Sequence, residues 1–333
     1  MTVTVAINGF GRIGRNVLRS IVENGRDDIQ VVAINDLGPV ETNAHLLRHD
    51  SVHGRFPSTV TVGENSISID GQEIRVTAER DPAKLPWADV DIALECTGIF
   101  TARDKAALHL QNGSKRVLVS APASGADATI VYGVNHDSLT ADDIIVSNAS
   151  CTTNCLSPVA KTLNDAVGIK RGFMTTIHSY TGDQPTLDTM HSDLYRSRAA
   201  AMNMIPTSTG AARAVGLVLP ELKGKLDGVA IRVPTPNVSV VDLTFEAARD
   251  TTAEEINDAV RAAAAGPLKG VLGVTDEKLV SMDFNHDSHS SIFATDQTKV
   301  LEGNMVRILS WYDNEWGFSC RMSDTAIAMA KLL

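Results

Sequence analysis

The side chains best suited to chemistry lie in the stretch SNASCTTNCLSP, residues 147–158, which holds two of the four cysteines of the chain. A helix is expected at about 151–166, with Ser150 as its N-cap. Cys151 then falls in the first turn, where the helix dipole favours a thiolate. Cys155 lies one turn further in, where a packing role is favoured. Cys151 is therefore a candidate nucleophile, with a small core residue as the alternative.

A nucleophilic thiol needs a base, and His178 is the candidate because it ends the apolar run FMTTIHSYT, an expected strand. A single strand histidine is more often structural, so its assignment depends on the cysteine. Hydroxyl, backbone and guanidinium groups that suit anions complete the set. The anion-binding candidates are Thr152, Thr181, Arg196, Thr209, Gly210 and Arg232.

A glycine loop predicts a second function, dinucleotide binding. The segment INGFGRIG places Gly9, Gly11 and Gly14 as G-x-G-x-x-G between an expected strand and an expected helix. Such glycines permit a tight turn and the close approach of a pyrophosphate to a helix N-terminus. Asp36 ends the next expected strand, where a carboxylate binds the ribose diol and repels a 2′-phosphate. The alternative is an ordinary strand-to-helix turn with an unrelated acid.

Two domains must position these residues, because 333 residues exceed one ordinary core. Before residue 150 short apolar runs alternate with helical stretches such as TARDKAALHLQNG, which predicts a parallel sheet. One exception is ISIDGQEIRV, a hairpin with Asp70-Gly71 at its turn. After residue 150 longer runs predict a mixed or antiparallel sheet, interrupted by the irregular segment 182–206. The expected class is α/β.

Composition excludes several classes of protein. A net charge of −10 argues against nucleic-acid binding as the main function. No apolar run approaches the ~20 residues of a membrane span. The N-terminus lacks a signal-peptide pattern, so a cytoplasmic location is expected. The cysteine spacing fits neither a zinc cluster nor a disulfide framework, so we expect free thiols and no metal site.

Five motifs together carry a resemblance to a known family. They are INGFGRIGR, SNASCTTNCL, PTSTGAARAVG, RVPTPNVSVVDL and SWYDNEWGFS. In this order, from residue 2 to about residue 331, the chain resembles the phosphorylating glyceraldehyde-3-phosphate dehydrogenases. The resemblance implies a Rossmann-type cofactor domain at 1–149, completed by a C-terminal helix at 315–333, and an α+β catalytic domain at 150–314. It also implies NAD-dependent oxidation and phosphorylation of D-glyceraldehyde 3-phosphate to 1,3-bisphosphoglycerate through a cysteine hemithioacetal and thioester, in glycolysis or gluconeogenesis.

The resemblance assigns a role to each matching residue. Cys151 corresponds to the nucleophile and His178 to the base. The site for the attacking inorganic phosphate corresponds to Ser150, Thr152, Thr209 and Gly210. The site for the phosphate of the substrate corresponds to Thr181, Arg196 and Arg232. The contacts to NAD correspond to Gly9, Gly11, Arg12, Ile13, Gly14, Asp36, Arg80, Ser120 and Asn314, the last at the nicotinamide carboxamide.

The segment 182–206 resembles a loop that reaches the cofactor of a neighbouring subunit in a homotetramer. Two positions in it depart from the family pattern. Arg198 competes with Arg196 for the phosphate role. Thr189-Met190 stand where many strictly NAD-using members have Leu-Pro, so NADP use stays open although Asp36 favours NAD.

Other functions remain as alternatives. The nearest is an erythrose-4-phosphate dehydrogenase, which would share fold, cysteine and cofactor. A binding protein that senses a dinucleotide belongs to a different class, and the negative charge and the intact cysteine–histidine pair argue against it. A thiol enzyme without redox chemistry would have no use for the glycine loop.

Overall fold

The computed structural model describes residues 2–333, which form two compact units. The first unit contains the chain up to Ile130, His136–Ala149 and Ser319–Leu333. The second unit contains Val131–Asn135 and Ser150–Phe318. Among these residues no helix has both the length and the apolar character needed to span a bilayer.

The first unit is built on a nine-stranded sheet with the strand order β10-β11-β9-β8-β1-β2-β7-β6-β5. Every pair from β10 to β7 is parallel, and β6 pairs antiparallel with its two neighbours. The strands are β1 (Val3–Asn8), β2 (Ile29–Asn35), β5 (Val60–Val62), β6 (Ser66–Ile69), β7 (Gln72–Thr77), β8 (Ile92–Glu95), β9 (Arg116–Val119), β10 (Ala128–Thr129) and β11 (Ile145–Ser147). A separate two-stranded sheet pairs β3 (His49–Asp50) with β4 (Gly54–Arg55).

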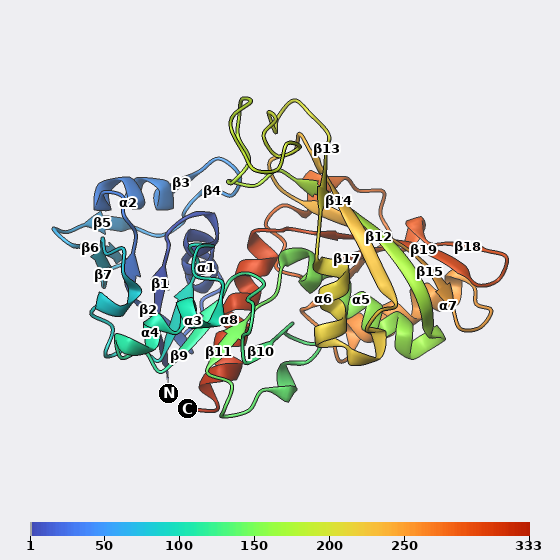
Figure 1. Cartoon of the computed structure of the whole chain (residues 1–333), viewed down its shortest axis with the longest axis horizontal. Coiled ribbons are helices and arrows are strands. Elements are labelled where there is room, and N and C mark those ends of the chain that lie inside the picture. Colours follow the sequence, from blue (N-terminus) through green and yellow to red (C-terminus); the bar gives the residue numbers. More distant parts are fainter. Residues whose placement is uncertain (1) are drawn as a thin grey trace. The chain divides into compact units, whose positions relative to one another are not determined.

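The helices of the first unit follow the strands along the chain (Figure 1). They are α1 (Arg12–Glu23), α2 (Val40–Arg48), α3 (Arg103–Ala106) and α4 (Leu108–Gln111), with short 3-10 turns at Pro82–Lys84 and His136–Ser138. The apolar face of α1 is buried, with Val17, Leu18 and Ile21 at most 5% exposed. The expected single helix over TARDKAALHLQNG is wrong. At Ala107 the chain tightens into a turn, in which the Leu110 N–H donates to the Ala107 carbonyl at 3.0 Å, and the helix divides in two.

The hairpin is confirmed: β6 and β7 pair antiparallel around Asp70 and Gly71, whose φ angles are 50° and 88°. Such positive angles at both central residues match the two-residue turns of hairpins. The C-terminal helix, expected at 315–333, is α8 (Trp316–Ala330). From Ser319 onward it belongs to the first unit, where the Thr325 hydroxyl donates to Asn148 Oδ1 at 2.8 Å.

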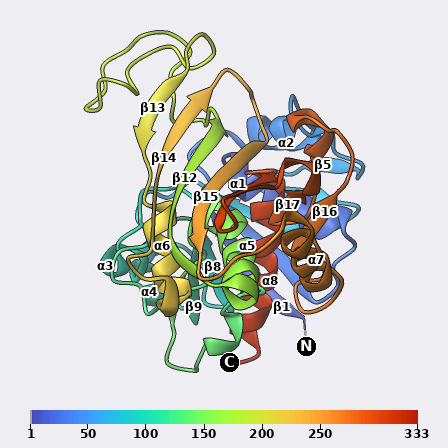
Figure 2. The same cartoon turned by 90° about the vertical axis from the view of Figure 1, so that its right-hand side faces the viewer.

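The second unit is built on an eight-stranded mixed sheet, seen in Figure 2, with the order β13-β14-β12-β15-β19-β17-β16 and β18 paired to β19. Its strands are β12 (Ile169–Ser179), β13 (Ile205–Ser208), β14 (Leu226–Val233), β15 (Ser239–Ala247), β16 (Leu272–Thr275), β17 (Ser291–Ala294), β18 (Lys299–Leu301) and β19 (Met305–Tyr312). Its helices are α5 (Cys151–Val167), α6 (Ala211–Val218) and α7 (Ala253–Ala265), with 3-10 turns at Pro220–Leu222, Ser281–Phe284 and Thr295–Gln297. The expected α/β class, a parallel sheet followed by a mixed sheet, is confirmed.

Strand β12 of this sheet carries the predicted base, His178. Met174, Thr176 and His178 are buried, whereas Phe173 and Ile177 are 53% and 38% exposed. Because side chains alternate along a strand, His178 lies on the covered face. Helix α5 packs against β12, β15, β17 and β19, so its first turn lies in the same unit as His178.

Candidate functional site

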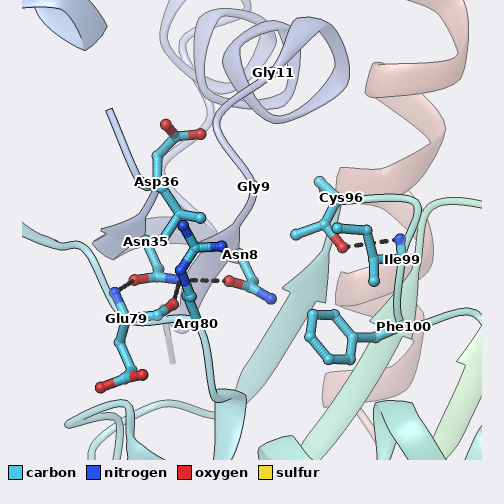
Figure 3. Close-up of a pocket in the computed structure, with 12 residues that line it drawn as sticks. Asn8, Gly9, Gly11, Asn35, Asp36, Glu79, Arg80, Cys96, Ile99 and Phe100 are labelled. Atoms are coloured by element: carbon cyan, nitrogen blue, oxygen red, sulfur yellow. Dashed lines mark hydrogen bonds between the residues drawn. The ribbon is translucent and has the colours of Figure 1, made fainter. Parts of the chain in front are cut away.

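A pocket of about 500 Å³ lies at the carboxyl ends of strands β1, β2 and β8 in the first unit (Figure 3). This edge is where parallel sheets of this kind bind ligands. The pocket is lined by Asn8, Gly9, Gly11, Asn35, Asp36, Leu37, Glu79, Arg80, Cys96, Thr97, Ile99 and Phe100.

The glycine loop fits a dinucleotide because two of its positions accept no side chain. A Cβ atom at Gly9, where φ is +90°, would lie 2.7 Å from the Thr97 nitrogen. A Cβ atom at Gly14 would lie 2.1 Å from the Gly9 carbonyl oxygen. Gly11 immediately precedes α1 and has open space where its Cβ would stand. The loop therefore brings bare backbone and a helix N-terminus to the pocket, as a pyrophosphate requires.

Asp36 is held rigidly beside this loop. Its Oδ2 atom accepts the Phe10 N–H at 2.9 Å, and its Oδ1 atom accepts the Gly38 N–H at 3.0 Å. A fixed carboxylate at the pocket suits a ribose diol and opposes a 2′-phosphate by like charge.

Of the other cofactor residues predicted in the first unit, Arg80 is among the residues that line the pocket, whereas Arg12, Ile13 and Ser120 are not. Arg80 lines it directly, and Ser120 follows β9, with its N–H bound to the Glu95 carbonyl at 3.0 Å. Arg12 and Ile13 lie in the first turn of α1. Arg12 forms an ion pair with Asp50. Burial opposes ionisation of Asp50, but hydrogen bonds from Arg12 and from backbone N–H groups outweigh it and lower the Asp50 pKa to about 2.

The predicted nucleophile begins helix α5 in the second unit. The Ser150 hydroxyl accepts the Thr153 N–H at 3.1 Å, so the expected N-cap is confirmed. Ala149 precedes it with a positive φ of 56°, an uncommon conformation for a residue with a Cβ atom. The chain thus turns sharply into the helix and places Cys151 in the first turn.

Cys151 lies beside the predicted base. Its Sγ atom is 3.5 Å from Nε2 of His178. Nδ1 of His178 lies 2.7 Å from the Ser179 carbonyl oxygen. The Ser179 carbonyl only accepts, whereas Nη1 of Arg232, 3.0 Å from the same Nδ1 atom, only donates. With the ring proton on Nδ1, shared with the shorter contact to the carbonyl, the lone pair of Nε2 faces the sulfur. The pair is arranged for transfer of the thiol proton to Nε2.

Electrostatics favour the neutral form of this pair. Burial and then the positive charge of Arg232 lower the His178 pKa to about 3. Burial raises the Cys151 pKa, and Arg232 together with Thr152 offsets only part of that effect. The expected preference for a thiolate at the helix terminus is thus opposed by burial of the sulfur.

Several predicted anion donors surround the histidine. Nη1 of Arg232 lies 3.0 Å from Nδ1 of His178 and donates to the Thr181 hydroxyl at 3.2 Å. The Thr181 hydroxyl donates to Asp183, which also pairs with Arg196. The carboxylate of Asp183 thus contacts two residues that are predicted to hold the substrate phosphate.

The two competing arginines have different partners. Arg196 pairs with Asp183, and its charge contributes to lowering the pKa of His178. Arg198 pairs with Asp188 at 2.8 Å, and its side chain is 59% exposed. The geometry therefore brings Arg196 into the electrostatic environment of His178.

A second group of donors gathers where two helices begin. The Thr153 hydroxyl donates to the carbonyl of Ala211, the first residue of α6, at 3.4 Å. Thr209 accepts the Ala211 N–H at 3.2 Å, and Gly210 is the N-cap of α6. The N-termini of α5 and α6, with Ser150, Thr209 and Gly210, are therefore neighbours. Two helix N-termini together favour an anion.

Thr152 takes a different position from these donors. Its hydroxyl lies 2.8 Å from the Tyr312 hydroxyl, which is 2.9 Å from the Thr176 hydroxyl, and all three side chains are buried. The side chain of Thr152 is thus directed inward.

Asn314 is oriented by two serines. Its Oδ1 atom accepts the Ser179 hydroxyl at 2.9 Å and the Ser239 hydroxyl at 2.8 Å. Because the oxygen of the Asn314 amide already accepts these two hydrogen bonds, its NH₂ group is left as the donor for another partner.

Cys155 is fully buried, with its Sγ atom 3.4 Å from the Ser291 hydroxyl, and burial raises its pKa to about 12. Cys96 lies just beyond the end of β8, where it lines the pocket of the first unit. All four cysteines are free. Within residues 2–333 no group of three or more His, Cys, Asp or Glu side chains is arranged to hold a metal ion.

Two groups of residues at these sites escaped the sequence analysis. Asp183 lies in the irregular segment and carries no motif of its own. The end-of-strand residues Asn8, Asn35 and Glu95 were seen only as parts of apolar runs. The position of Asn8 and Asn35 at the ends of strands beside the glycine loop is the signal that would have found them.

Known proteins resemble the chain over its whole length. Residues 3–103 match the family described as glyceraldehyde 3-phosphate dehydrogenase, NAD binding domain, and residues 150–314 match its C-terminal domain. The chain is 78% identical to glyceraldehyde-3-phosphate dehydrogenase of Cereibacter sphaeroides and 73% identical to that of Xanthobacter flavus, and each comparison covers 100% of both chains. It is 59% identical to the enzyme of that name from Pseudomonas aeruginosa, with 99% of each chain covered.

Proposed function

Because the chain belongs to the glyceraldehyde-3-phosphate dehydrogenase family, we propose that it is an NAD-dependent oxidoreductase acting on D-glyceraldehyde 3-phosphate. The products are 1,3-bisphosphoglycerate and NADH, and inorganic phosphate is the second substrate. The observation that carries the proposal is the Cys151–His178 pair, 3.5 Å apart, in the same unit as the anion donors.

Each step of the proposed reaction can be assigned to particular residues of the chain. Cys151 gives its proton to Nε2 of His178 and adds to the aldehyde carbon, and His178 passes that proton to the former carbonyl oxygen, which completes the hemithioacetal and leaves His178 neutral. The Cys151 backbone N–H and His178 stabilise charge on the substrate oxygen. Bound NAD⁺ supplies the hydride acceptor. Loss of hydride and of the hydroxyl proton, which His178 takes, leaves a thioester on Cys151. Attack by inorganic phosphate then breaks the carbon–sulfur bond and returns the thiolate.

Two anion sites follow from this chemistry. We propose that Thr181, Arg196 and Arg232 hold the phosphate of the substrate, because Arg232 and Arg196 act on His178 electrostatically. The paired N-termini of α5 and α6 are proposed to hold the attacking phosphate through Ser150, Thr152, Thr209 and Gly210. Thr152 would contribute its backbone N–H, since its hydroxyl is directed to Tyr312.

The cofactor is proposed to bind the first unit through the glycine loop. Gly9, Gly11 and Gly14 provide close approach, and Asp36 favours NAD over NADP. Arg12, Ile13, Arg80 and Ser120 are proposed as further contacts, and Asn314 of the second unit as the donor to the nicotinamide carboxamide. Thr189-Met190, which stand where many strictly NAD-using members of the family have Leu-Pro, are the positions that would permit NADP use.

We propose a homotetramer, the assembly that the family resemblance implies, and exposed apolar side chains support contacts between subunits. Phe173 and Ile177 lie on the uncovered face of the second sheet. In the segment 182–206, Met190 is 96% and Leu194 81% exposed. Apolar surface of this kind marks contact sites between proteins. A cytoplasmic location is proposed because all four cysteines are free thiols.

The test is NADH formation with glyceraldehyde 3-phosphate and, separately, with erythrose 4-phosphate, each with and without inorganic phosphate. We expect far faster turnover of glyceraldehyde 3-phosphate, and only when phosphate or arsenate is present. Full activity without phosphate would exclude a phosphorylating enzyme, and preference for the four-carbon aldehyde would favour the alternative function. Cys151→Ser provides the matched inactive control.

A further inference from the structure

A row of polar side chains crosses the first sheet directly beneath the dinucleotide pocket. Glu95, Asn8, Asn35 and Thr77 are the last residues of β8, β1, β2 and β7, which are consecutive strands of the sheet. The register pairs Asn8 with both Glu95 and Asn35, and pairs Asn35 with Thr77. Glu95, Asn8 and Asn35 are at most 4% exposed.

Hydrogen bonds join this end-of-strand row without a break. Asn8 Nδ2 donates to Glu95 Oε2 at 2.7 Å, and Asn35 Nδ2 donates to Asn8 Oδ1 at 2.7 Å. Asn35 Oδ1 accepts the Thr77 hydroxyl and the Glu79 N–H, each at 2.9 Å, while Asn35 Nδ2 also reaches the Glu79 carbonyl at 2.8 Å. Figure 3 shows the part of the row that runs from Glu79 through Asn35 to Asn8.

Glu95 is the acceptor at one end of the row, and four donors converge on it. Oε2 accepts from Asn8 and lies 2.9 Å from Nε2 of His109, which is fully buried. Oε1 accepts the N–H of Thr97 at 2.9 Å and also the Thr97 hydroxyl. An ionised carboxylate accepts at both oxygens and donates at neither, so it is the group that matches four donors.

His109 is arranged to donate to Glu95. Its ring is stacked on Trp87, with a centroid separation of 5.5 Å and an interplanar angle of 7°. In the described part of the chain, Nδ1 of His109 is buried without a hydrogen-bond partner. A neutral ring with its proton on Nε2 therefore leaves a lone pair at Nδ1, which costs less than a buried unpaired N–H.

We propose that Glu95 is a positioning residue for the cofactor, because its carboxylate fixes the orientation of the side-chain amides that form the floor of the dinucleotide pocket. Asn8 must present NH₂ to Glu95 and therefore oxygen to Asn35. Asn35 must then present NH₂ to Asn8 and oxygen to the Glu79 N–H. Asn8, Asn35, Glu79 and Thr97 all line the pocket, so the row connects its two sides.

Glu95→Gln tests this arrangement because an amide cannot match four donors. If the Gln oxygen accepts from Thr97, its NH₂ group meets the NH₂ group of Asn8. If the amide is turned, its NH₂ meets the Thr97 backbone N–H, which cannot turn. Rotation of Asn8 only moves the mismatch to Asn35, which the Glu79 backbone holds in place. The defect therefore reaches the pocket.

The inference rests on the proposed use of NAD⁺, so the experiment measures binding of NAD⁺ by calorimetry, without turnover. For Glu95→Gln we expect the Kd and the KM for NAD⁺ to rise about tenfold, since a buried donor loses its acceptor, while kcat at saturating NAD⁺ changes less than about twofold.

Thr325→Val is the matched control, because it removes a buried hydrogen bond of the same unit away from the row. It should lower thermal stability and leave the Kd unchanged. The rate of Cys151 alkylation without NAD⁺ should be unchanged in both variants.

His109 provides a second test that does not depend on the folding of Glu95→Gln. The amide of His109→Gln can still donate to Glu95, whereas His109→Leu cannot. We expect His109→Gln to bind NAD⁺ more tightly than His109→Leu. The proposal is overturned if Glu95→Gln keeps the wild-type Kd, if Thr325→Val weakens binding as much, or if the two His109 variants bind equally. Failure of the wild-type chain to bind NAD⁺ would instead contradict the proposed function.

Discussion

The Sγ atom of Cys151 lies 3.5 Å from Nε2 of His178, and the two groups face each other as a neutral thiol and a neutral imidazole. Burial, and after it the positive charge of Arg232, lowers the pKa of His178 and favours its neutral form. The thiol proton therefore has an acceptor in place.

We expect substoichiometric iodoacetamide to label Cys151 first and to abolish activity in proportion. Cys151 has Nε2 of His178 3.5 Å away as an acceptor for its proton, whereas Cys155 is buried and burial raises the pKa values of Cys96 and Cys155 to about 12. Peptide mapping of the first labelled thiol is the measurement. As a control, Cys155→Ala should keep the labelling pattern and cost about 1–3 kcal/mol of stability. Labelling of Cys155 ahead of Cys151 would reverse the assignment of the two cysteines.

Acid should destabilise the wild-type protein more than His178→Asn. The pKa of His178 is about 3 in the folded chain against an ordinary 6.5, so the unfolded chain binds more protons between these values. Stability therefore falls as the pH falls through this window, and the wild type should lose about 2 kcal/mol more than the variant between about pH 7 and about pH 5. Chemical denaturation at both pH values measures the difference. Equal losses would mean that folding does not lower the pKa of His178.

Arg196→Leu and Arg198→Leu form a matched pair. Arg196 shares Asp183 with Thr181, whereas Arg198 pairs with Asp188 and is largely exposed. Loss of a charge-assisted hydrogen bond to phosphate predicts that Arg196→Leu raises the KM for glyceraldehyde 3-phosphate by roughly tenfold or more. Arg198→Leu should change it less than about twofold, as expected of an exposed ion pair. Steady-state kinetics at saturating NAD⁺ and phosphate distinguish them, and the opposite order would assign the phosphate to Arg198.

Asp36→Gly should narrow the preference for NAD⁺ over NADP⁺. The carboxylate is fixed by the N–H groups of Phe10 and Gly38, so it cannot move away from a 2′-phosphate. Its removal relieves a repulsion of a few kcal/mol at most. The ratio of kcat/KM for the two cofactors is the readout. If the wild type already uses both equally, Thr189-Met190 become the positions to substitute.

The sequence was sufficient where local chemistry decides the structure. Ser150 caps α5 because a hydroxyl before a helix accepts a first-turn N–H, and Asp70-Gly71 form the hairpin turn because both tolerate a positive φ. Gly9 and Gly14 could be recognised by their spacing, and the structure supplies the reason, which is the absence of room for a Cβ atom.

The sequence was insufficient where distant contacts decide. Asp183 meets Thr181 and Arg196 through an irregular loop, and no periodic pattern encodes that meeting. The inward direction of the Thr152 hydroxyl depends on Tyr312, 160 positions away. The raised pKa of Cys151 reflects burial, which a helix-start motif does not contain.

The return of the chain to the first unit at Ser319 has a consequence for synthesis on the ribosome. Arg26 pairs with Asp324 at 2.7 Å, and Arg116 donates to the Leu332 carbonyl at 2.8 Å, so early residues need partners that are translated last. The N-terminal unit therefore emerges first and is finished last. A nascent chain that stops before Ser319 leaves the binding surfaces for α8 uncovered, and full assembly of the first unit must be post-translational.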